Sequence, residues 1–226
     1  MSVRRDLAHL IGADAVRDVE AIRQVYDGDA YPIDRSQPTC VAWPTSTDEV
    51  AKIVRYCVAH EVPFTPRGAG TGLSGGAMPA LGGVVISTKR MKEILEIDAP
   101  NRRLRAQSGI ANKRISDAVA QYGLHFAPDP SSQSVSTLGG NIAENAGGPH
   151  TLKYGVTVRH ILAATLVLPD GEIVEIGRGV PGGPGLDLLG VVVGSEGTTG
   201  IVTEATVRLT PLPSAVRTTL AAFPSI

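Results

Sequence analysis

From residue 66 to residue 76 the chain reads Pro66-Arg67-Gly68-Ala69-Gly70-Thr71-Gly72-Leu73-Ser74-Gly75-Gly76. Five of the nine residues from Gly68 onward are glycine, and Thr71 and Ser74 add hydroxyl groups. Without Cβ atoms, successive backbone N–H groups can converge on one concavity, and such nests bind anions. A diphosphate is the natural ligand of this loop, and the alternative is a tight turn that binds nothing. Arg67 could pair with a phosphate or hold the loop by a salt bridge, and the sequence leaves both roles open.

Two familiar phosphate-binding motifs come close to this stretch without fitting it. Gly70, Gly72 and Gly75 match the pattern G-x-G-x-x-G, but the Rossmann version needs a helix that begins inside the motif. Here residues 77–83 lead into a strand-like run at 84–87, so no helix is expected. A Walker A loop is excluded because no Gly-Lys-Ser/Thr closes the motif.

Two more glycine-rich segments follow. Residues 127–150 are predicted to form one long loop, in which hydroxyl and amide side chains are interleaved with glycines and alanines. Loops beyond about 12–15 residues are uncommon unless they are functional, and this mixture suits a planar ring with polar edges. The third segment, 194–201, leads into a strand. Its Glu196 is either a functional acid or a structural cap, and the structural role is favoured.

The elements around the first segment form a small α/β unit. Ser46 and Glu49 make a capping box in front of a helix predicted over 47–60. Predicted strands follow at 62–66 and 84–87, and then a pair at 94–98 and 104–108. Before this unit, residues 6–25 are predicted as a helix in an N-terminal extension that packs on the main body.

A second α/β unit begins near residue 112. It contains a helix capped by Asn112 and closed by Gly123, and a hairpin formed by 161–168 and 172–176. Residues 186–193 are a short helix or a buried strand, and an alternating strand occupies 201–210. The last residues, 221–226, resemble the start of another strand.

The composition is that of an ordinary globular protein. Of 226 residues, 42% are apolar and 19% are charged, and the formal net charge of −1 argues against a nucleic-acid binder. Cys40 and Cys57 give neither a metal-binding spacing nor a disulfide framework. No signal-peptide-like start and no apolar run of the ~20 residues that span a bilayer is present, so a cytoplasmic protein without membrane insertion is expected. The 26 glycines gather at 66–83, 139–148, 177–185 and 194–200.

As an ordered set, these segments resemble the FAD-binding domain of vanillyl-alcohol-oxidase (PCMH-type) flavoproteins. The likeness covers roughly residues 37–213 and is strongest to glycolate oxidase FAD-binding subunits and to D-lactate and D-2-hydroxy-acid dehydrogenases. Residues 67–76 look like the pyrophosphate loop of the family and 139–148 like its flavin-side loop. Lys153-Tyr154-Gly155 and residues 194–201 continue the match.

The resemblance implies an α+β fold of two α/β subdomains with FAD between them. The expected organisation is an N-terminal helical extension (1–36), subdomain 1 (37–110), subdomain 2 (111–215) and the start of a missing C-terminal domain (216–226). Relatives that attach flavin covalently through the loop carry a histidine in it. This loop has none, so FAD is expected to bind non-covalently.

The resemblance and the loop chemistry together nominate cofactor-binding residues but no catalytic residue and no metal ligand. The nominated residues are Pro66, Arg67, Gly68, Ala69, Gly70, Thr71, Gly72, Ser74, Gly75, Pro130, Ser131, Thr137, Gly139, Gly140, Asn141, Ala143, Ala146, Gly147, Gly148, Tyr154, Gly155, Glu196, Gly200 and Ile201.

The function that the resemblance implies is that of a flavin-dependent 2-hydroxy-acid oxidase or dehydrogenase of the glycolate or D-lactate type. Its substrate would bind through the missing C-terminal domain, and iron–sulfur subunits are the partners that the family implies. Any association with a membrane would go through such partners. Two alternatives stay open, namely a non-catalytic flavin-binding subunit completed by a partner chain and a nucleotide binder without flavin.

Overall fold

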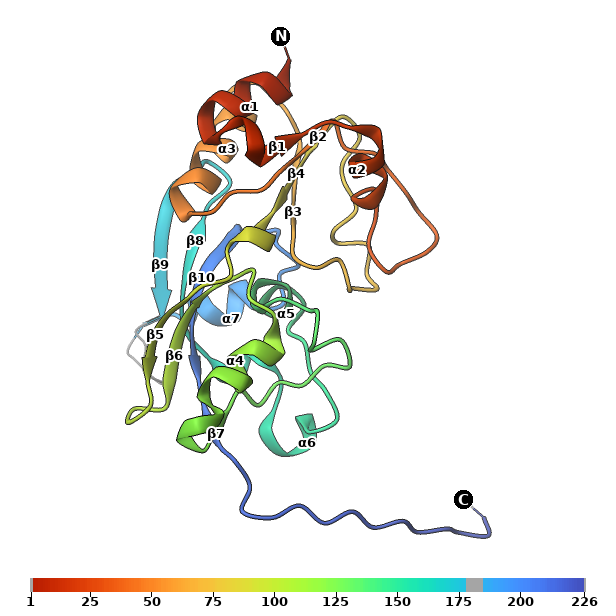
Figure 1. The fold of residues 1–226 in the computed structure, drawn as a ribbon, viewed down its shortest axis with the longest axis vertical. Coiled ribbons are helices and arrows are strands. Elements are labelled where there is room, and N and C mark those ends of the chain that lie inside the picture. Colours follow the sequence, from red (N-terminus) through yellow and green to blue (C-terminus); the bar gives the residue numbers. More distant parts are fainter. Residues whose placement is uncertain (1, 178–184, 226) are drawn as a thin grey trace.

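The computed structural model describes residues 2–177 and 185–225. Two β-sheets follow one another along the long axis, the first built from the N-terminal half and the second mostly from the C-terminal half (Figure 1). The predicted α+β class is therefore confirmed. Most of the glycine-rich stretch at 177–185 lies outside the described residues.

The first sheet has the strand order β1-β2-β4-β3, formed by Val16–Arg17, Cys40–Ala42, Val84–Ser87 and Phe64–Arg67. Strands β2, β4 and β3 are parallel, and β1 runs antiparallel to β2. Helix α3 (Thr47–Ala59), which the sequence predicts over 47–60, connects β2 to β3. Its capping serine is confirmed, because the N–H of Glu49 donates to Ser46 Oγ at 3.2 Å.

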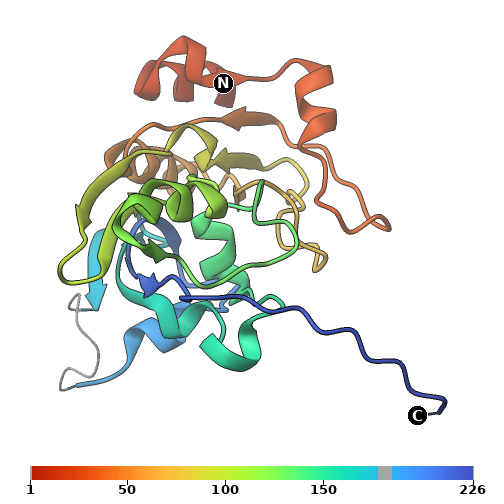
Figure 2. The same cartoon turned by 60° about the horizontal axis from the view of Figure 1, so that its bottom comes forward.

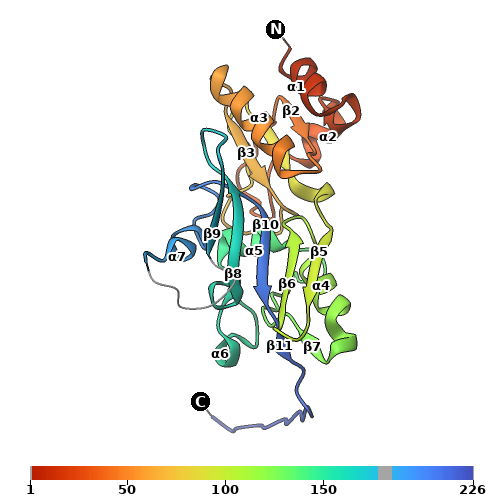
Figure 3. The same ribbon diagram turned by 90° about the vertical axis from the view of Figure 1, so that its left-hand side faces the viewer.

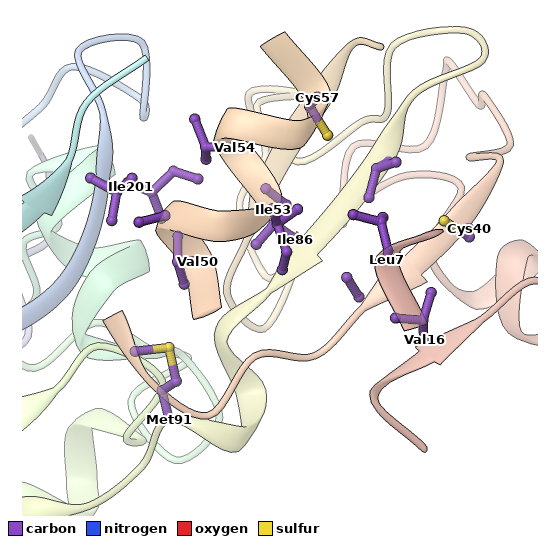
Figure 4. Close-up of a cluster of buried hydrophobic side chains, with 14 residues drawn as sticks. Leu7, Val16, Cys40, Val50, Ile53, Val54, Cys57, Ile86, Met91 and Ile201 are labelled. Carbon is purple, nitrogen blue, oxygen red and sulfur yellow. The ribbon is translucent and has the colours of Figure 1, made fainter. Parts of the chain in front are cut away.

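Helix α3 also joins the two sheets. Its stripe of Val50, Ile53, Val54 and Cys57 is fully buried. Figure 4 shows this stripe between Ile86 of β4 and Ile201 of the second sheet. A single apolar core thus fixes the position of one sheet relative to the other.

The N-terminal segment differs from the predicted single helix over 6–25. It forms α1 (Val3–Ile11), a short 3-10 turn (Ala13–Ala15), β1 and α2 (Glu20–Val25). Gly12 ends α1 with a φ of +97°, and Val16 then pairs with Ala42 of β2. The segment therefore contributes a strand to the first sheet, because tertiary pairing overrides local helix propensity.

The second sheet has the order β5-β6-β10-β8-β9, formed by Ile94–Asp98, Arg103–Gln107, Ile201–Arg208, Ile161–Val167 and Ile173–Gly177. All neighbouring strands are antiparallel. The predicted hairpins are confirmed. The hairpin β5–β6, which the sequence groups with the first unit, pairs with β10 of the second sheet instead. The domain boundaries themselves stay a prediction.

Helices α4 (Asn112–Val119) and α5 (Leu138–Glu144) cover one face of the second sheet (Figure 3). The short helix α6 (Thr151–Tyr154) follows α5, and α7 (Leu188–Val192) packs beside β8 and β9. The helical alternative for 186–193 is thereby confirmed. Strands β7 (Leu124–His125) and β11 (Thr210–Pro211) form a small antiparallel pair.

Two predictions about this region are wrong. The predicted loop over 127–150 contains α5, which Thr137 caps. The low helix propensity of Gly139 and Gly140 argues against a helix here, although one forms. Asn112 does not cap α4. Its amide is buried, donating to the Pro128 carbonyl at 2.7 Å and accepting from Asn141 at 2.8 Å. Gly123, with a φ of +68°, ends the helical segment as predicted.

After β11, residues 212–225 form neither helix nor strand and extend away from the body (Figure 1), so the strand-like start predicted at 221–226 is not formed in the described residues. Among the described residues, no helix has the length and apolarity that crossing a bilayer requires.

Candidate functional site

The glycine loop, residues 68–83, leaves the first sheet at the carboxyl end of β3. Strands β3 and β4 run parallel there, with Pro66 opposite Ile86 and Arg67 opposite Ser87. Ligands of α/β sheets bind beyond the carboxyl ends of parallel strands. The loop contains turns but neither helix nor strand before β4 begins. The prediction that this motif does not lead into a helix is confirmed.

The backbone amides of the glycine-rich part of this loop, from Gly68 to Gly76, differ from those that follow them in having no partner among the described residues. Among the described residues, none of the N–H groups from Gly68 to Gly76 donates a hydrogen bond to the protein. Gly70 and Gly75 have φ values of +72° and +77°, which direct the chain into a left-handed path that glycine adopts readily. Backbone N–H groups that are partly buried need acceptors. A run of such donors at the mouth of a cleft is the chemistry that an anionic ligand requires.

The first turn of α5 forms the facing wall. Its amides are already bonded within the protein, with Gly139 N–H donating to the Ser108 carbonyl at 2.8 Å and Gly140 N–H to Thr137 Oγ1 at 3.2 Å. Gly68 lies against this helix start, because a Cβ on Gly68 would collide with Thr137 Oγ1. The helix end therefore supports the glycine loop without offering free donors of its own.

The third glycine segment connects α7 to β10 and lies beside the end of α5. Gly194 N–H donates to the Ile142 carbonyl at 2.8 Å, and Glu196 N–H to the Ala143 carbonyl at 2.9 Å. Glu196 has a φ of +54°, an uncommon conformation for a residue with a side chain. Its carboxylate accepts no hydrogen bond from the described residues and lines the cleft, so the favoured role as a structural cap finds no support.

The three segments enclose a cleft of about 320 Å³. Many of the nominated residues line it, namely Pro66, Arg67, Gly68, Ala69, Gly70, Thr71, Gly72, Pro130, Thr137, Gly139, Gly140, Asn141, Ala143, Ala146, Glu196, Gly200 and Ile201. Segments that are far apart in the sequence thus converge on one space, as the resemblance implies.

Other nominated residues lie outside the cleft, namely Ser74, Gly75, Ser131, Gly147, Gly148, Tyr154 and Gly155. A Cβ on Gly147 would lie 2.8 Å from Thr151 Oγ1, so this glycine permits a close approach to α6. Tyr154 packs edge-on against His125, with ring centroids 5.8 Å apart. These positions shape the corner around α6, and their contact with a cofactor stays a prediction.

Several lining residues were not predicted, namely Asp29, Leu73, Gly76, Ala77, Thr88, Ser132, Ser136, Glu144, Val192, Ser195, Gly197 and Val202. Glu144 belongs to the segment 139–148 that resembles the flavin-side loop, and its carboxylate is a polar group that sequence reasoning could have selected. Asp29 carries no local signal, because only the tertiary fold brings the N-terminal segment to the loop.

Among the charged residues that line the cleft are Glu144, Glu196 and Arg67. Burial raises the pKa of Glu144, and the nearby carboxylate of Glu196 raises it further by a smaller amount. Ser74 Oγ donates a hydrogen bond to the Glu144 carboxylate at 3.3 Å. Burial lowers the pKa of Arg67. The Arg67 guanidinium donates to the Gly28 carbonyl and lies 5.0 Å from the centre of the Tyr26 ring. These two contacts are with a carbonyl and a ring rather than with a carboxylate, and which of its two open roles Arg67 plays stays a prediction.

The histidine nearest to the flavin-side segment, His150, pairs with Asp129 at 2.5 Å and lies outside the cleft. In residues 2–177 and 185–225 no group of three histidine, cysteine or acidic side chains is arranged to hold a metal ion.

The donor set of the cleft fits a dinucleotide. Unbonded loop amides at one end suit a diphosphate, and small or apolar residues such as Ala143, Ala146 and Ile201 suit the face of a ring. The fold and the site together define a dinucleotide-binding domain of two sheets, distinct from the Rossmann class.

The sequence model described as "FAD binding domain" matches residues 38–177. The chain belongs to this PCMH-type FAD-binding domain family, and FAD is the cofactor of the family. The resemblance drawn from the glycine segments is confirmed.

Curated relatives support the same family. The chain is 44% identical over 218 residues to the glycolate oxidase subunit GlcD of Escherichia coli K12, covering 96% of this chain and 44% of the relative. It is 44% identical to GlcD of Bacillus subtilis 168, with coverages of 99% and 48%. It is 43% identical to a D-lactate dehydrogenase of Anaerostipes hadrus, with coverages of 80% and 38%. The chain spans less than half the length of each of these relatives.

A solved structure of alkyldihydroxyacetonephosphate synthase has the same fold. Its TM-score is 0.84 at 26% identity, with 94% of this chain and 41% of that chain covered. The predicted PCMH-type fold is confirmed by this likeness together with the family match.

Proposed function

We propose that this chain is the FAD-binding domain of a flavin-dependent 2-hydroxy-acid oxidase or dehydrogenase and holds FAD non-covalently in the cleft. The observation that carries the proposal is the run of unbonded amides from Gly68 to Gly76, a stretch that, apart from Ser74 and Gly75, lines the cleft together with the first turn of α5. The diphosphate of FAD would accept hydrogen bonds from these amides. The cleft residues nominated from the sequence are the proposed binding residues.

The chemistry of the proposed reaction belongs to the cofactor. Bound FAD supplies a two-electron acceptor for the hydride at the CH–OH carbon of a 2-hydroxy acid. The chain supplies binding and orientation. The loop amides fix the phosphates, and the α5 segment with Ala143 and Ala146 offers a flat, small-residue surface for the ring. We assign no catalytic acid or base to the cleft residues.

The substrate class comes from the relatives. The names of similar proteins mention glycolate, D-lactate and D-2-hydroxyglutarate, all of which are 2-hydroxy acids. We propose that the substrate binds through a further domain, because the chain spans less than half of each relative. The alternative is that the chain binds FAD but needs a partner chain for activity. It is supported by relatives that are named as subunits. Iron–sulfur subunits are the proposed partners.

An ultraviolet–visible spectrum of the purified protein tests the proposal. We expect the yellow absorbance of oxidised flavin. Heat denaturation should then release free FAD into the supernatant, whereas a yellow pellet would indicate covalent attachment.

Reduction tests where the substrate binds. Dithionite should bleach the flavin, whereas anaerobic bleaching by glycolate or D-lactate would mean that this chain binds the substrate without a further domain or a partner chain. A colourless protein that cannot be reconstituted with FAD, while binding ADP, would contradict both the proposal and its partner-dependent alternative.

A further inference from the structure

Residues 26–36, which we name the strap, form most of the connection from α2 to β2 and lie beside the glycine loop (Figures 1 and 2). The family match begins at residue 38, so the strap lies outside the matched region. Its contacts nevertheless converge on the part of the chain whose amides are free.

Three neighbouring strap residues hold the glycine loop directly. Ala30 N–H donates to the Gly72 carbonyl at 3.1 Å. Asp29 is only 8% exposed, lines the cleft, and its carboxylate accepts from Ala77 N–H at 3.5 Å. The ring of Tyr31 lies 3.9 Å from the point where a Cβ on Gly75 would stand. The loop from Gly72 to Ala77 therefore rests on the strap.

Arg67 connects the strap to the loop from the other side. Its guanidinium donates to the Gly28 carbonyl and lies over the Tyr26 ring at 5.0 Å. The same guanidinium fills the space beneath Gly70, because a Cβ on Gly70 would collide with it. The Arg67 side chain thus contacts the strap, at Tyr26 and Gly28, and also lies against the glycine loop at Gly70.

The strap is itself a closed element. Asp27 and Arg35 form an ion pair at 2.9 Å, and Ser36 N–H donates to the Asp27 carbonyl at 2.8 Å. Tyr26 is anchored to the first sheet, since Trp43 Nε1 donates to its hydroxyl at 3.0 Å. Because hydrogen bonds and an ion pair fix the strap internally, the strap can hold the shape of the neighbouring glycine loop, which has few hydrogen bonds of its own.

Preorganisation explains why this junction matters. A loop that becomes ordered only when a ligand binds pays a cost in conformational entropy, which lowers the affinity. A loop that is already held in its bound shape avoids this cost. We propose that Arg67 is a positioning residue and that the strap is part of the FAD-binding site, because together they hold the glycine loop in its anion-binding shape. This inference rests on the proposed function, in which the diphosphate of FAD occupies the loop.

Binding of FAD to the apoprotein tests this proposal through two variants. Arg67→Met removes the donor and the cation, and Ala30→Pro removes the N–H that holds Gly72. We expect each to weaken FAD binding by about tenfold or more, measured by quenching of flavin fluorescence. The melting temperature of the apoprotein, followed in parallel, reports any loss of folding. Ala30→Ser changes the side chain at the same exposed position but keeps the N–H, so any loss of affinity in Ala30→Pro beyond that of Ala30→Ser is due to the lost hydrogen bond.

A double-mutant cycle distinguishes positioning from direct contact. If Arg67 acts through the strap, the double variant should bind FAD only slightly less tightly than the single variant with the lower affinity. The reason is that both changes break the same junction. Arg67→Lys, which keeps the charge but lacks the planar fork, should then fail to restore binding. Additive losses, together with rescue by Arg67→Lys, would mean that Arg67 contacts phosphate directly and would overturn the proposal.

The remaining outcomes are also decisive. Variants that fold and bind FAD as tightly as the wild type contradict the role of the strap, while the proposed function stands. A folded wild-type chain that binds no FAD contradicts the proposed function itself.

Discussion

Two glycine-rich segments face each other across the cleft, and they use glycine for opposite reasons. In the loop from Gly68 to Gly76 the backbone amides have no partner among the described residues. In the first turn of α5 they donate to Ser108, Ile110 and Thr137. Gly72 of the loop leaves space beside open donors, whereas Gly139 of the helix allows the helix and Ser108 to approach closely.

The difference shows that glycine content alone does not identify a ligand-binding backbone. Gly139 is required by packing, because a Cβ there would lie 2.8 Å from the Ser108 Cβ. Gly72 is not required by packing, because the nearest atom to a Cβ there is Glu144 Oε1 at 3.6 Å. A glycine with space around it and a free amide nearby is the stronger sign of a site.

The largest expected effect is on stability, from Gly139→Ala. Although alanine is the better helix former, the added methyl group overlaps Ser108, and overpacking a tight contact costs about 1–3 kcal/mol. We expect a free energy of unfolding in urea that is lower by about 2 kcal/mol.

Ser108→Gly in the same chain is the matching rescue. It removes the Cβ that the new methyl group meets, and the Ser108 hydroxyl has no partner to lose in the described residues. If Gly139→Ala is as stable as the wild type, the distinction between a packing glycine and a binding glycine fails.

The next effect is on binding, from Gly72→Ala. Its methyl group enters the cleft without a clash, so the apoprotein should keep its stability. We expect FAD affinity to fall about tenfold, or about 1.4 kcal/mol, because the methyl group holds the diphosphate away from the amides. Calorimetric titration of the apoprotein measures this loss.

Ala80→Ser is the control for Gly72→Ala, since it adds a similar bulk to the same loop at an exposed residue outside the cleft. Equal affinities for Gly72→Ala and the wild type would remove the loop from the proposed binding site.

Sequence reasoning succeeded where the pattern is local. The cap at Ser46, the stripe from Val50 to Cys57 and the absence of a helix after Gly76 all follow from residues within a few positions. The order of the glycine segments was enough to identify the family.

The predictions that failed depend on contacts between distant segments. The strand at Val16 exists because Ala42 lies beside it, and α5 exists despite Gly139 and Gly140 because Ser108 and Thr137 receive its amides. Asp29 reaches the cleft only through the fold. Such contacts leave no periodicity or spacing in the sequence.

A smaller effect is expected from Thr137→Ala, which removes the cap of α5. Loss of a side-chain cap costs about 1 kcal/mol. Because Thr137 also supports Gly68, FAD binding should weaken slightly as well. Thr137→Ser keeps the oxygen and should retain most of the stability in the same urea titration. A neutral Thr137→Ala would mean that the α5 amides do not depend on this cap.

The smallest effect concerns Glu144, which lies where the two segments meet. Burial and then Glu196 raise the pKa of Glu144 above its ordinary value of 4.5. The folded chain therefore binds this proton more tightly than the unfolded chain, and the resulting stabilisation is full below pH 4.5 and lost as the pH rises through the raised pKa. At neutral pH the ionised carboxylate opposes folding, by less than about 0.5 kcal/mol because solvent screens a group this exposed.

Glu144→Gln removes that penalty. The gain in melting temperature over the wild type should be larger at pH 7 than at pH 4. Glu172→Gln, at an exposed turn, should show no such dependence on pH. Because Gly72 and Gly76 would place a Cβ 3.6 and 3.5 Å from Glu144 Oε1, the same carboxylate also faces the amides of the loop. Glu144→Gln should therefore bind FAD at least as tightly as the wild type at neutral pH. Weaker binding would instead mean that Glu144 accepts hydrogen bonds from the cofactor, and that the helix segment shares in ligand recognition with the loop.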